Sequence, residues 1–239
     1  MLIRQFQAQR MQPPRDFQPI PDTTICVEIG AGKGMQAPRD FIAIANSPIC
    51  VEIGAGKGKH ALLFTAEHPQ ATLYAIERTR EKFVAMQKQH QLEPREHLNP
   101  VHADALPWVV HALFPTHVEQ FFILYPNPEP HNPAQRWLNM PFFEFLLSRL
   151  KPNGMITLAS NIPAYIDEAE QQLIDVWKLP YQKQKIATDS ARTHFEIKYL
   201  ERGELCQQLL ITKPQDYQTR FDDFAPLQGR NIQGQPDGK

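Results

Sequence analysis

Three glycines spaced two residues apart follow an acidic residue, and this pattern is the strongest chemical signal in the chain. It reads Glu52-Ile53-Gly54-Ala55-Gly56-Lys57-Gly58, with an apolar segment before it and a helix-forming segment after it. Glycine allows a tight turn in which backbone amides come close to a ligand. A dinucleotide-binding turn would need its third glycine where Lys59 stands, and a phosphate-binding loop would need Ser or Thr after its lysine. Both nucleotide sites are therefore disfavoured, and a turn that binds no ligand stays open as a minor alternative.

Two further acidic residues follow the next two predicted strands. Glu77 ends the second strand, where a carboxylate can accept hydrogen bonds from both hydroxyls of a ribose. Asp104 follows the third strand, where it could hold the edge of an adenine. Each residue alone could instead cap the helix that follows it. Together with Glu52, they favour an adenosyl ligand over a phosphate, because carboxylates repel a pyrophosphate.

The glycine turn occurs twice, because a 24-residue segment is duplicated in tandem. Residues 11–34 and 35–58 are identical at 17 of 24 positions. A helix-forming sequence follows Gly58, whereas Pro38 soon follows Gly34 and disfavours a helix there. The second copy is therefore predicted to form the working site, and the first copy belongs to an N-terminal arm, residues 1–47. Deletion of residues 11–34 should leave ligand binding intact.

From residue 48 onward, short apolar runs alternate with helical patterns, which is typical of a parallel sheet with helices on both faces. The predicted strands are 49–53, 72–76, 100–102, 120–125, 155–159 and 205–212. The predicted helices are 59–68, 79–90, 107–114, 141–150 and 163–177. The sequence thus predicts a doubly wound α/β domain over residues 48–212, followed by a polar, mobile C-terminal tail, residues 213–239.

The composition is that of a globular protein without a global attraction to nucleic acid. The chain has 239 residues, 42% of them hydrophobic, with 25 basic and 26 acidic side chains. Any RNA binding must therefore use a local patch of charge. Three cysteines are too few for a disulfide framework, and neither a membrane span nor a signal pattern is found, so we expect a soluble cytoplasmic protein. The sequence does not specify an oligomeric state.

The glycine turn and the acid that ends the second strand resemble the class I S-adenosylmethionine-dependent methyltransferases. Three further segments resemble the tRNA (guanine-N7)-methyltransferases within that class. Residues 121–128 are similar to a strand and the Pro-Asp-Pro turn of that family, residues 158–165 to its Thr-Asp motif and following tyrosine, and residues 193–196 to its Thr-Lys-Phe-Glu motif. The order and spacing agree over roughly residues 48–212. The resemblance implies a Rossmann-like fold with a mostly parallel seven-stranded sheet, in which one late strand is antiparallel.

The resemblance also implies a cofactor, a partner and an activity. These are S-adenosylmethionine, tRNA and methyl transfer to guanine N7, with no metal expected. The residues implied to hold the cofactor are Glu52, Gly54, Ala55, Gly56, Gly58, Glu77, Asp104, Ala105 and Asn127. Those implied to position the substrate are His131, Arg136, Asn161, Thr193, Phe195 and Glu196, with Asn127 as the catalytic residue.

The chain departs from the family pattern at charged positions. Asn127 and Asn161 stand where the family has aspartates, and His194 stands where it has lysine. Guanine N7 carries a free lone pair, so methyl transfer to it needs alignment of donor and acceptor rather than a strong base. Replacing a carboxylate with Asn keeps an acceptor oxygen but removes charge. Rate or substrate choice could therefore differ from those of the family.

The loop over residues 129–140 is shorter and less basic than the family pattern. It keeps two candidate cations, His131 and Arg136, and His131 could simply be a solvated loop residue. Fewer phosphate contacts predict weaker and less salt-sensitive RNA binding.

Other functions remain open. The Asn-Pro-x-Pro sequence at Asn127 also resembles the Asn-Pro-Pro-Tyr turn of enzymes that methylate exocyclic amino groups, although the stacking aromatic is missing. The turn could also be a proline-stiffened loop without a chemical role. The protein could act on another acceptor, or it could be a non-catalytic module that binds RNA or an adenosyl group. Phe142, Phe143 and Phe145 have helical spacing and are interpreted as core residues.

Overall fold

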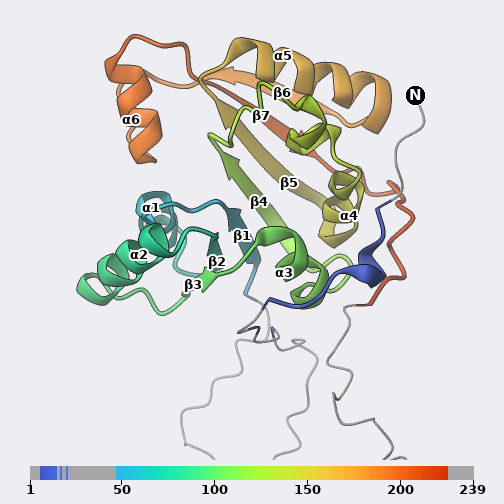
Figure 1. The fold of residues 1–239 in the computed structure, drawn as a ribbon, viewed down its shortest axis with the longest axis horizontal. Coiled ribbons are helices and arrows are strands. Elements are labelled where there is room, and N and C mark those ends of the chain that lie inside the picture. The colour runs from blue at the N-terminus through green and yellow to red at the C-terminus, as the bar shows by residue number, and fades with distance from the viewer. Residues whose placement is uncertain (1–5, 15–16, 18–19, 21–46, 226–239) are drawn as a thin grey trace, which may run out of the picture.

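The described residues of the computed structural model, 6–14, 17, 20 and 47–225, contain a seven-stranded sheet (Figure 1). The strand order is β3-β2-β1-β4-β5-β7-β6. Neighbours from β3 to β5 pair in parallel, and β7 pairs antiparallel with both β5 and β6. The predicted mostly parallel sheet with one late antiparallel strand is confirmed. The strands are β1 (Ile49–Ile53), β2 (Thr72–Glu77), β3 (Leu98–His102), β4 (Val118–Leu124), β5 (Leu150–Ser160), β6 (Tyr181–Lys185) and β7 (Gln207–Thr212).

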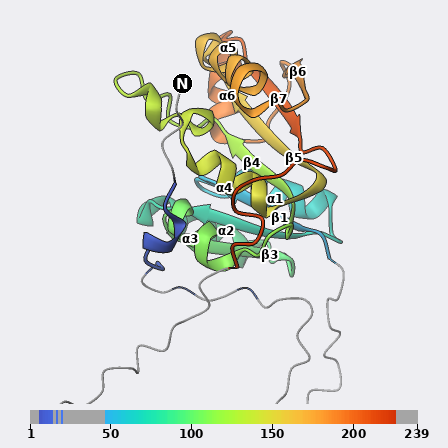
Figure 2. The ribbon, with the colours of Figure 1, turned by 90° about the vertical axis from the view of Figure 1, so that its right-hand side faces the viewer.

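Helices cover both faces of the sheet (Figure 2). Alternate residues of one strand enter different cores: Val51 packs with α3, α4 and α5, whereas Cys50 packs with α1 and α2. This alternation follows from the period of two in a strand. The α-helices are α1 (Lys59–Glu67), α2 (Arg80–Leu92), α3 (Ala105–Ala112), α4 (Phe142–Arg149), α5 (Pro163–Gln172) and α6 (His194–Glu201). Short turns of other helix types are η1 (Ala8–Arg10), η2 (Pro133–Gln135), η3 (Trp137–Asn139) and η4 (Leu173–Trp177).

Three features of the chain after β5 differ from the predictions. The helix predicted over 163–177 is α-helical only to Gln172 and ends in the π-helical turn η4. Strand β6 was missed, because its residues are mostly exposed and polar, so the sequence carries no apolar run. Helix α6 was missed as an element, because eight residues give only two turns of periodicity.

The two copies of the duplicated segment contribute different parts to the fold. Residues 49–58 of the second copy form β1 and the glycine turn, which leads into α1 as predicted. Residues of the first copy pack against α3: the ring nitrogen Nε2 of His111 lies 2.8 Å from the carbonyl oxygen of Met11, and Phe17 meets the His111 ring edge-on. Ile20 is also buried. The predicted strand and glycine turn of the first copy lie outside the described residues.

Deleting residues 11–34 should leave both the fold and ligand binding intact. The deletion joins Arg10 to the second copy, whose sequence repeats the apolar residues that pack against α3; the counterparts of Met11, Phe17 and Ile20 are Met35, Phe41 and Ile44. We expect calorimetry to give an unchanged affinity for an adenosyl ligand. We also expect denaturation in urea to give a free energy of unfolding within about 1 kcal/mol of the full chain, because surface segments change stability little with length.

The same deletion combined with Phe41→Ala is the control, and it should be less stable than the deletion alone because it lacks the aromatic group that replaces Phe17. Loss of ligand binding in the simple deletion would instead assign the working turn to the first copy.

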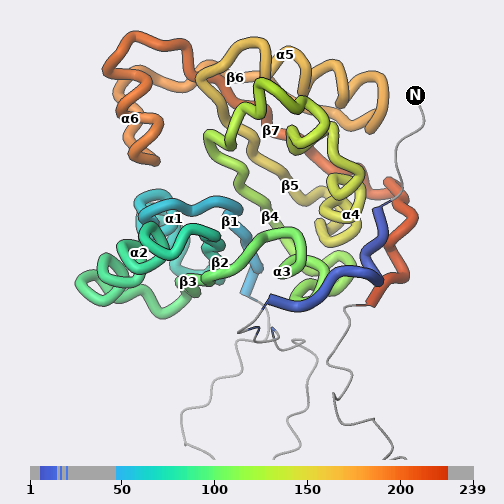
Figure 3. The backbone as a smooth tube through the Cα atoms, in the orientation of Figure 1, coloured from blue at the N-terminus to red at the C-terminus, as the bar shows by residue number. Residues whose placement is uncertain are grey.

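The chain beyond β7 corrects the prediction of a mobile tail for residues 213–225. Phe221 and Phe224 pack on Phe145 of α4, and Phe6 from the N-terminal arm packs on Phe221 as well, so the two arms lie side by side (Figure 3). Arg149 is fully buried among them. Its guanidinium donates hydrogen bonds to the carbonyl oxygens of Leu113, Phe221 and Phe224. Burial lowers the pKa of Arg149 to about 9.

The prediction failed here because aromatic residues spaced along a polar segment give no periodic signal, and their binding surface is formed by distant elements. Residues 226–239 of the predicted tail lie outside the described residues. Within the described part of the chain, no helix is long and apolar enough to cross a membrane.

Candidate functional site

The glycine turn after β1 has an open outer side. Gly54 and Gly56 have φ values of +79° and +59°, which side chains other than glycine rarely adopt. A Cβ atom built on either residue would meet nothing within 4 Å, so free space lies next to the turn. Gly58 differs, because its Cβ would lie 2.5 Å from Cγ of Met86 in α2. Gly58 is therefore required for close packing of the helices, and the first two glycines leave room for a ligand.

Most amides of the turn are already bonded within the protein. The N–H groups of Gly54 and Ala55 both donate to the carbonyl oxygen of Ile76, each at 2.9 Å. The N–H of Gly58 donates to Ala55. Amides that are paired in this way do not form an anion-binding nest, so the geometry disfavours a phosphate and agrees with the prediction from the glycine spacing.

Glu77 at the end of β2 ties the glycine turn to α2. Its side chain is 6% exposed, its Oε2 accepts the N–H of Gly56 at 2.9 Å, and its Oε1 accepts the N–H of Thr79 at 2.6 Å. An ionised carboxylate has about four lone-pair sites, so each oxygen can accept one more hydrogen bond. Glu77 is thus held rigidly at the edge of the open space, with acceptor capacity left for two hydroxyl groups.

Glu52 and Asp104 flank this residue in different surroundings. Glu52 is 2% exposed, and its Oε2 lies 3.1 Å from Nδ1 of His60 without hydrogen-bond geometry. Asp104 is exposed and accepts the N–H of Leu106 as the N-cap of α3, which Ala105 begins. The capping role that the sequence left open for Asp104 is therefore observed. Its predicted contact with an adenine stays a prediction, as does the cofactor contact of Glu52.

Asn127 lies in the exposed turn after β4, at the same edge of the sheet. Its side-chain amide donates from Nδ2 to Oε1 of Glu129 at 2.7 Å. The backbone here is unusual, because Tyr125 and Glu129 have φ values of +53° and +46°. The turn therefore presents an amide and a carboxylate together.

Arg136 holds this turn in place instead of facing solvent. Its Nε donates to the carbonyl oxygen of Pro128 at 2.9 Å, its Nη1 pairs with Glu168 of α5, and its guanidinium lies over the ring of Tyr165. The side chain of Arg136 is only 17% exposed. This placement argues against the predicted contact with substrate phosphate, and it leaves the exposed His131 as the candidate cation of the loop.

Asn161 after β5 also bonds to a carboxylate. Its Nδ2 donates to Oε2 of Glu204 at 2.6 Å. Asn127 and Asn161 both stand where the family has aspartates. Each thus donates a hydrogen bond from its amide nitrogen to a glutamate. The sequence could not reveal the second pair, because its partners are 43 positions apart.

Glu196 is fully buried in a network that joins α6 to the end of β4. It accepts hydrogen bonds from the hydroxyls of Tyr125 and Ser190 and from the guanidinium of Arg192. Burial alone would raise the pKa of Glu196, but the hydrogen bonds from Arg192, Ser190 and Tyr125 lower it to about 2. Burial and the bond to Glu196 raise the pKa of the Tyr125 hydroxyl. Glu196 is therefore ionised, and Tyr125 stays protonated as a donor to it.

The other two residues of this motif have distinct positions. The Thr193 hydroxyl accepts the N–H of Glu196 as the N-cap of α6. The Phe195 ring is 44% exposed. The motif thus supplies a cap, an exposed ring and a buried anion. A base contact by Thr193 or Glu196 stays a prediction, and Tyr125, Ser190 and Arg192 are the residues of this network that the sequence did not reveal.

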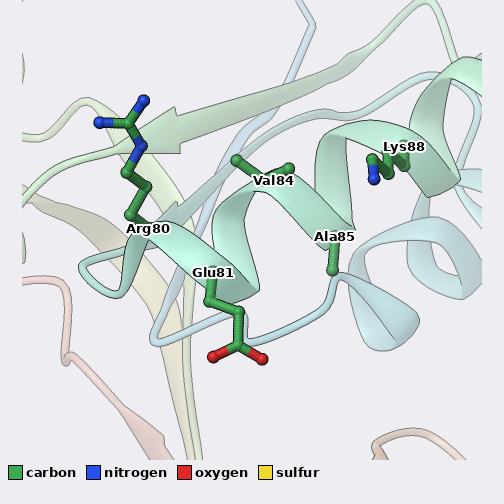
Figure 4. Close-up of a pocket in the computed structure, with 5 residues that line it drawn as sticks. All are labelled: Arg80, Glu81, Val84, Ala85 and Lys88. Atoms are coloured by element: carbon green, nitrogen blue, oxygen red, sulfur yellow. The ribbon is translucent and has the colours of Figure 1, made fainter.

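A surface hollow of about 540 Å³ lies along α2 (Figure 4). Its lining is Arg80, Glu81, Val84, Ala85 and Lys88. All five residues come from one helix, and Figure 4 shows Arg80 and Glu81 pointing away from each other. A ligand site normally has polar groups that converge from several elements, so the glycine turn stays the better candidate. Among the described residues, no group of His, Cys, Asp and Glu could hold a metal ion.

Comparisons with known proteins bear on the family and the fold of the chain. A family model described as "Putative methyltransferase" matches residues 46–208, and no curated protein matches the chain. Among solved structures, the precorrin-6y C5,15-methyltransferase of Geobacter metallireducens is similar with a TM-score of 0.52 and 15% identity, covering 70% of this chain and 81% of that one. A methyltransferase from Pyrococcus furiosus also gives a TM-score of 0.52, with 12% identity over 71% of this chain and 76% of that one. At such identities the structural likeness shows the fold alone.

Proposed function

This chain is a divergent member of the tRNA (guanine-N7)-methyltransferase family, which belongs to the class I S-adenosylmethionine-dependent methyltransferases, and we propose that it methylates N7 of a guanine in tRNA in the cytoplasm. The family match establishes a methyltransferase that uses S-adenosylmethionine. The acceptor, the target atom and the cellular location are our proposal.

The residues around the glycine turn fit the cofactor. The open side of Gly54 and Gly56 accommodates an adenosyl group, and Glu77 stands at its edge with free lone pairs for two ribose hydroxyls. S-adenosylmethionine supplies a methyl group bound to a positively charged sulfur. The turn's internally bonded amides suit this ligand, because it carries no phosphate.

The acceptor side requires orientation and charge rather than a base. Guanine N7 has a free lone pair, and the base gains positive charge as the methyl group arrives. Asn127 and Asn161 can accept from the N–H groups of the base with their amide oxygens, because each already uses its amide nitrogen on a glutamate. The protein thus aligns the base without removing a proton from it.

The observation that carries the proposal is the pairing of both asparagines with carboxylates. Glu129 and Glu204 lie 2.7 Å and 2.6 Å from the amide nitrogens of Asn127 and Asn161. Negative charge that the sequence seemed to have lost at the two family aspartate positions is therefore present one hydrogen bond away. At about 7 Å, the span of one intervening amide, such a carboxylate favours a developing cation by roughly 0.6 kcal/mol in water and about 2 kcal/mol near a protein surface.

The direct test is nucleoside mass spectrometry of unmodified tRNA after incubation with the protein and S-adenosylmethionine. A 7-methylguanosine peak is expected. If no methylated nucleoside forms while calorimetry confirms cofactor binding, the proposed acceptor is wrong.

Glu204→Gln should lower the turnover rate about tenfold, because it removes the charge beside Asn161 but keeps the side-chain shape. The affinity for S-adenosylmethionine, measured by calorimetry, should not change. Glu201→Gln, an exposed glutamate at the end of α6, is the matched control and should turn over like the parent. Equal turnover rates in the Glu204→Gln and Glu201→Gln variants would show that the charge of Glu204 does not contribute to catalysis.

A different acceptor is the second candidate, and the placement of Arg136 favours it. This residue is bonded to Glu168 and Pro128, so the loop offers little positive charge to an RNA backbone. A panel of small molecules and RNAs separates the two candidates: methylation of tRNA alone excludes the second. Turnover above that of a Glu77→Ala variant excludes the third alternative, a non-catalytic binding module.

A further inference from the structure

Helix α6 presents a row of aromatic rings that runs from the surface to the end of β4. Phe195 is 44% exposed and stacks on Tyr199, with centroids 6.0 Å apart and ring planes 18° apart. Tyr199 in turn lies 5.7 Å from Tyr125, which follows β4 and precedes the turn that holds Asn127. Several large apolar side chains are exposed in the described part of the chain, and Phe195 is the aromatic one among them. Part of the Phe195 ring surface is therefore accessible to a further ring, and Tyr199 supports the ring from within the protein.

Cations surround the outer end of this row. The ammonium group of Lys82 in α2 lies 5.8 Å from the centre of the Phe195 ring. Burial, with Lys59 and Lys57 of the glycine turn nearby, lowers the pKa of His194. The start of α6 therefore lies near α2 and the glycine turn, where Lys57, Lys59 and Lys82 supply positive charge.

Glu196, the acidic residue next to Phe195, does not cancel these positive charges. Glu196 is fully buried and paired with Arg192, so its negative charge is neutralised inside the protein. An exposed ring among cations is the combination that binds single-stranded nucleic acid, because the cations attract phosphate and the ring stacks on a base.

We propose that Phe195, supported by Tyr199 and flanked by Lys57, Lys59 and Lys82, is a stacking platform for an unpaired base of the RNA substrate. The platform rests on the proposed function and adds to it the form of RNA that is bound. A base paired in a helix shows only its edges in the grooves, so a stacking face selects a loop, a bulge or an end. The lysines of the glycine turn, α1 and α2 replace the cations that the loop over residues 129–140 lacks.

The test is binding of a short single-stranded RNA that carries one 2-aminopurine, whose fluorescence is quenched when the base stacks. The full-length protein should quench the single strand and bind its fully paired duplex more weakly. Phe195→Ala should weaken binding of the single strand about fivefold and abolish the quenching, because one stacked base contributes at least about 1 kcal/mol, or a factor of about five. Phe195→Trp should preserve both, whereas Phe195→Leu should resemble Phe195→Ala because it keeps apolar volume without a ring.

Two more variants complete the design. Leu92→Ala removes a 77% exposed apolar side chain at the end of α2 and should bind RNA like the parent. Lys82→Ala should reduce the dependence of log affinity on log salt concentration by about 0.7, the value for one phosphate contact on a single strand. Equal binding by the Phe195→Ala and Leu92→Ala variants would overturn the platform, and so would duplex binding as tight as that of the single strand.

Failure of the platform and failure of the proposed function are distinguishable. If tRNA gains 7-methylguanosine but Phe195→Ala binds RNA normally, the platform alone is wrong. If no guanine is methylated but binding of the single strand depends on Phe195, the proposed acceptor is wrong and the platform stands.

Discussion

Replacing Glu77 with alanine should weaken binding of S-adenosylmethionine at least tenfold, as measured by titration calorimetry. Glu77 is bonded directly to the glycine turn, and its two oxygens are fixed by the backbone N–H groups of Gly56 and Thr79. A hydrogen bond to a charged acceptor contributes roughly 1.5 to 3 kcal/mol, so the loss of one ribose contact already exceeds a factor of ten. Loss of two contacts would give a factor of about one hundred or more.

The substitution also releases the glycine turn, so the two causes must be separated. A cofactor analogue without the ribose hydroxyls makes the separation. The parent protein should bind the 2′,3′-dideoxy analogue much more weakly than S-adenosylmethionine, whereas Glu77→Ala should bind the two ligands equally. A penalty for the analogue that is the same in both proteins would mean that the carboxylate orders the turn without contacting the ribose.

Glu81→Ala is the matched control, because Glu81 is an exposed glutamate in the first turn of α2. It should bind S-adenosylmethionine like the parent. An unchanged affinity in Glu77→Ala would contradict the assignment of the cofactor site to the carboxyl ends of β1 and β2.

The sequence predicted the part of the site that is formed by consecutive segments. The run before Gly54 is buried on both faces of the sheet, so it is apolar throughout and stands out in the sequence. The glycine spacing predicts the backbone conformation of the turn, because the positive φ values at Gly54 and Gly56 strongly favour glycine. The position of Glu77 follows from the strand period alone. Local rules therefore determine this half of the site.

The acceptor half was predicted less completely, because its contacts join distant segments. Tyr125 and Glu196 are 71 positions apart, and Asn161 and Glu204 are 43 apart. Arg136, which was predicted as a substrate cation, pairs with Glu168 of α5, 32 positions away. Neither spacing nor composition carries information on which of several charged residues will meet. The side-chain pairing could be seen only once the fold had placed α5 and α6.

Replacing Glu196 with glutamine should destabilise the protein by about 3 kcal/mol at pH 7. The substitution keeps the shape of the side chain but leaves Arg192 beside a neutral amide, and removing one partner of a buried ion pair typically costs about 3 to 5 kcal/mol. Denaturation in urea gives the free energy of unfolding. Because Glu196 links α6 to Tyr125, hydrogen exchange of the α6 amides should also become faster.

The loss should depend on pH in a defined direction. The pKa of Glu196 falls from an ordinary value of 4.5 to about 2 in the folded protein, so the folded state prefers the ionised form. A lowered pKa contributes stability that is fully present above pH 4.5 and is lost as the pH falls toward 2. The shift corresponds to about 3 kcal/mol. The parent protein should therefore lose its advantage over Glu196→Gln progressively below pH 4.5, because protonated glutamate resembles glutamine in shape and charge.

Urea titrations at several pH values between 7 and 3 measure this difference. Glu201→Gln, an exposed glutamate of the same helix, corrects for the change in net charge and should show no such convergence. A difference between parent and Glu196→Gln that stays constant from pH 7 to pH 3 would mean that the side chain acts through its shape alone. In that case the anion would not be what joins α6 to the end of β4, and the platform at Phe195 would have to be held in place by the packing of Tyr199 and Leu200 instead.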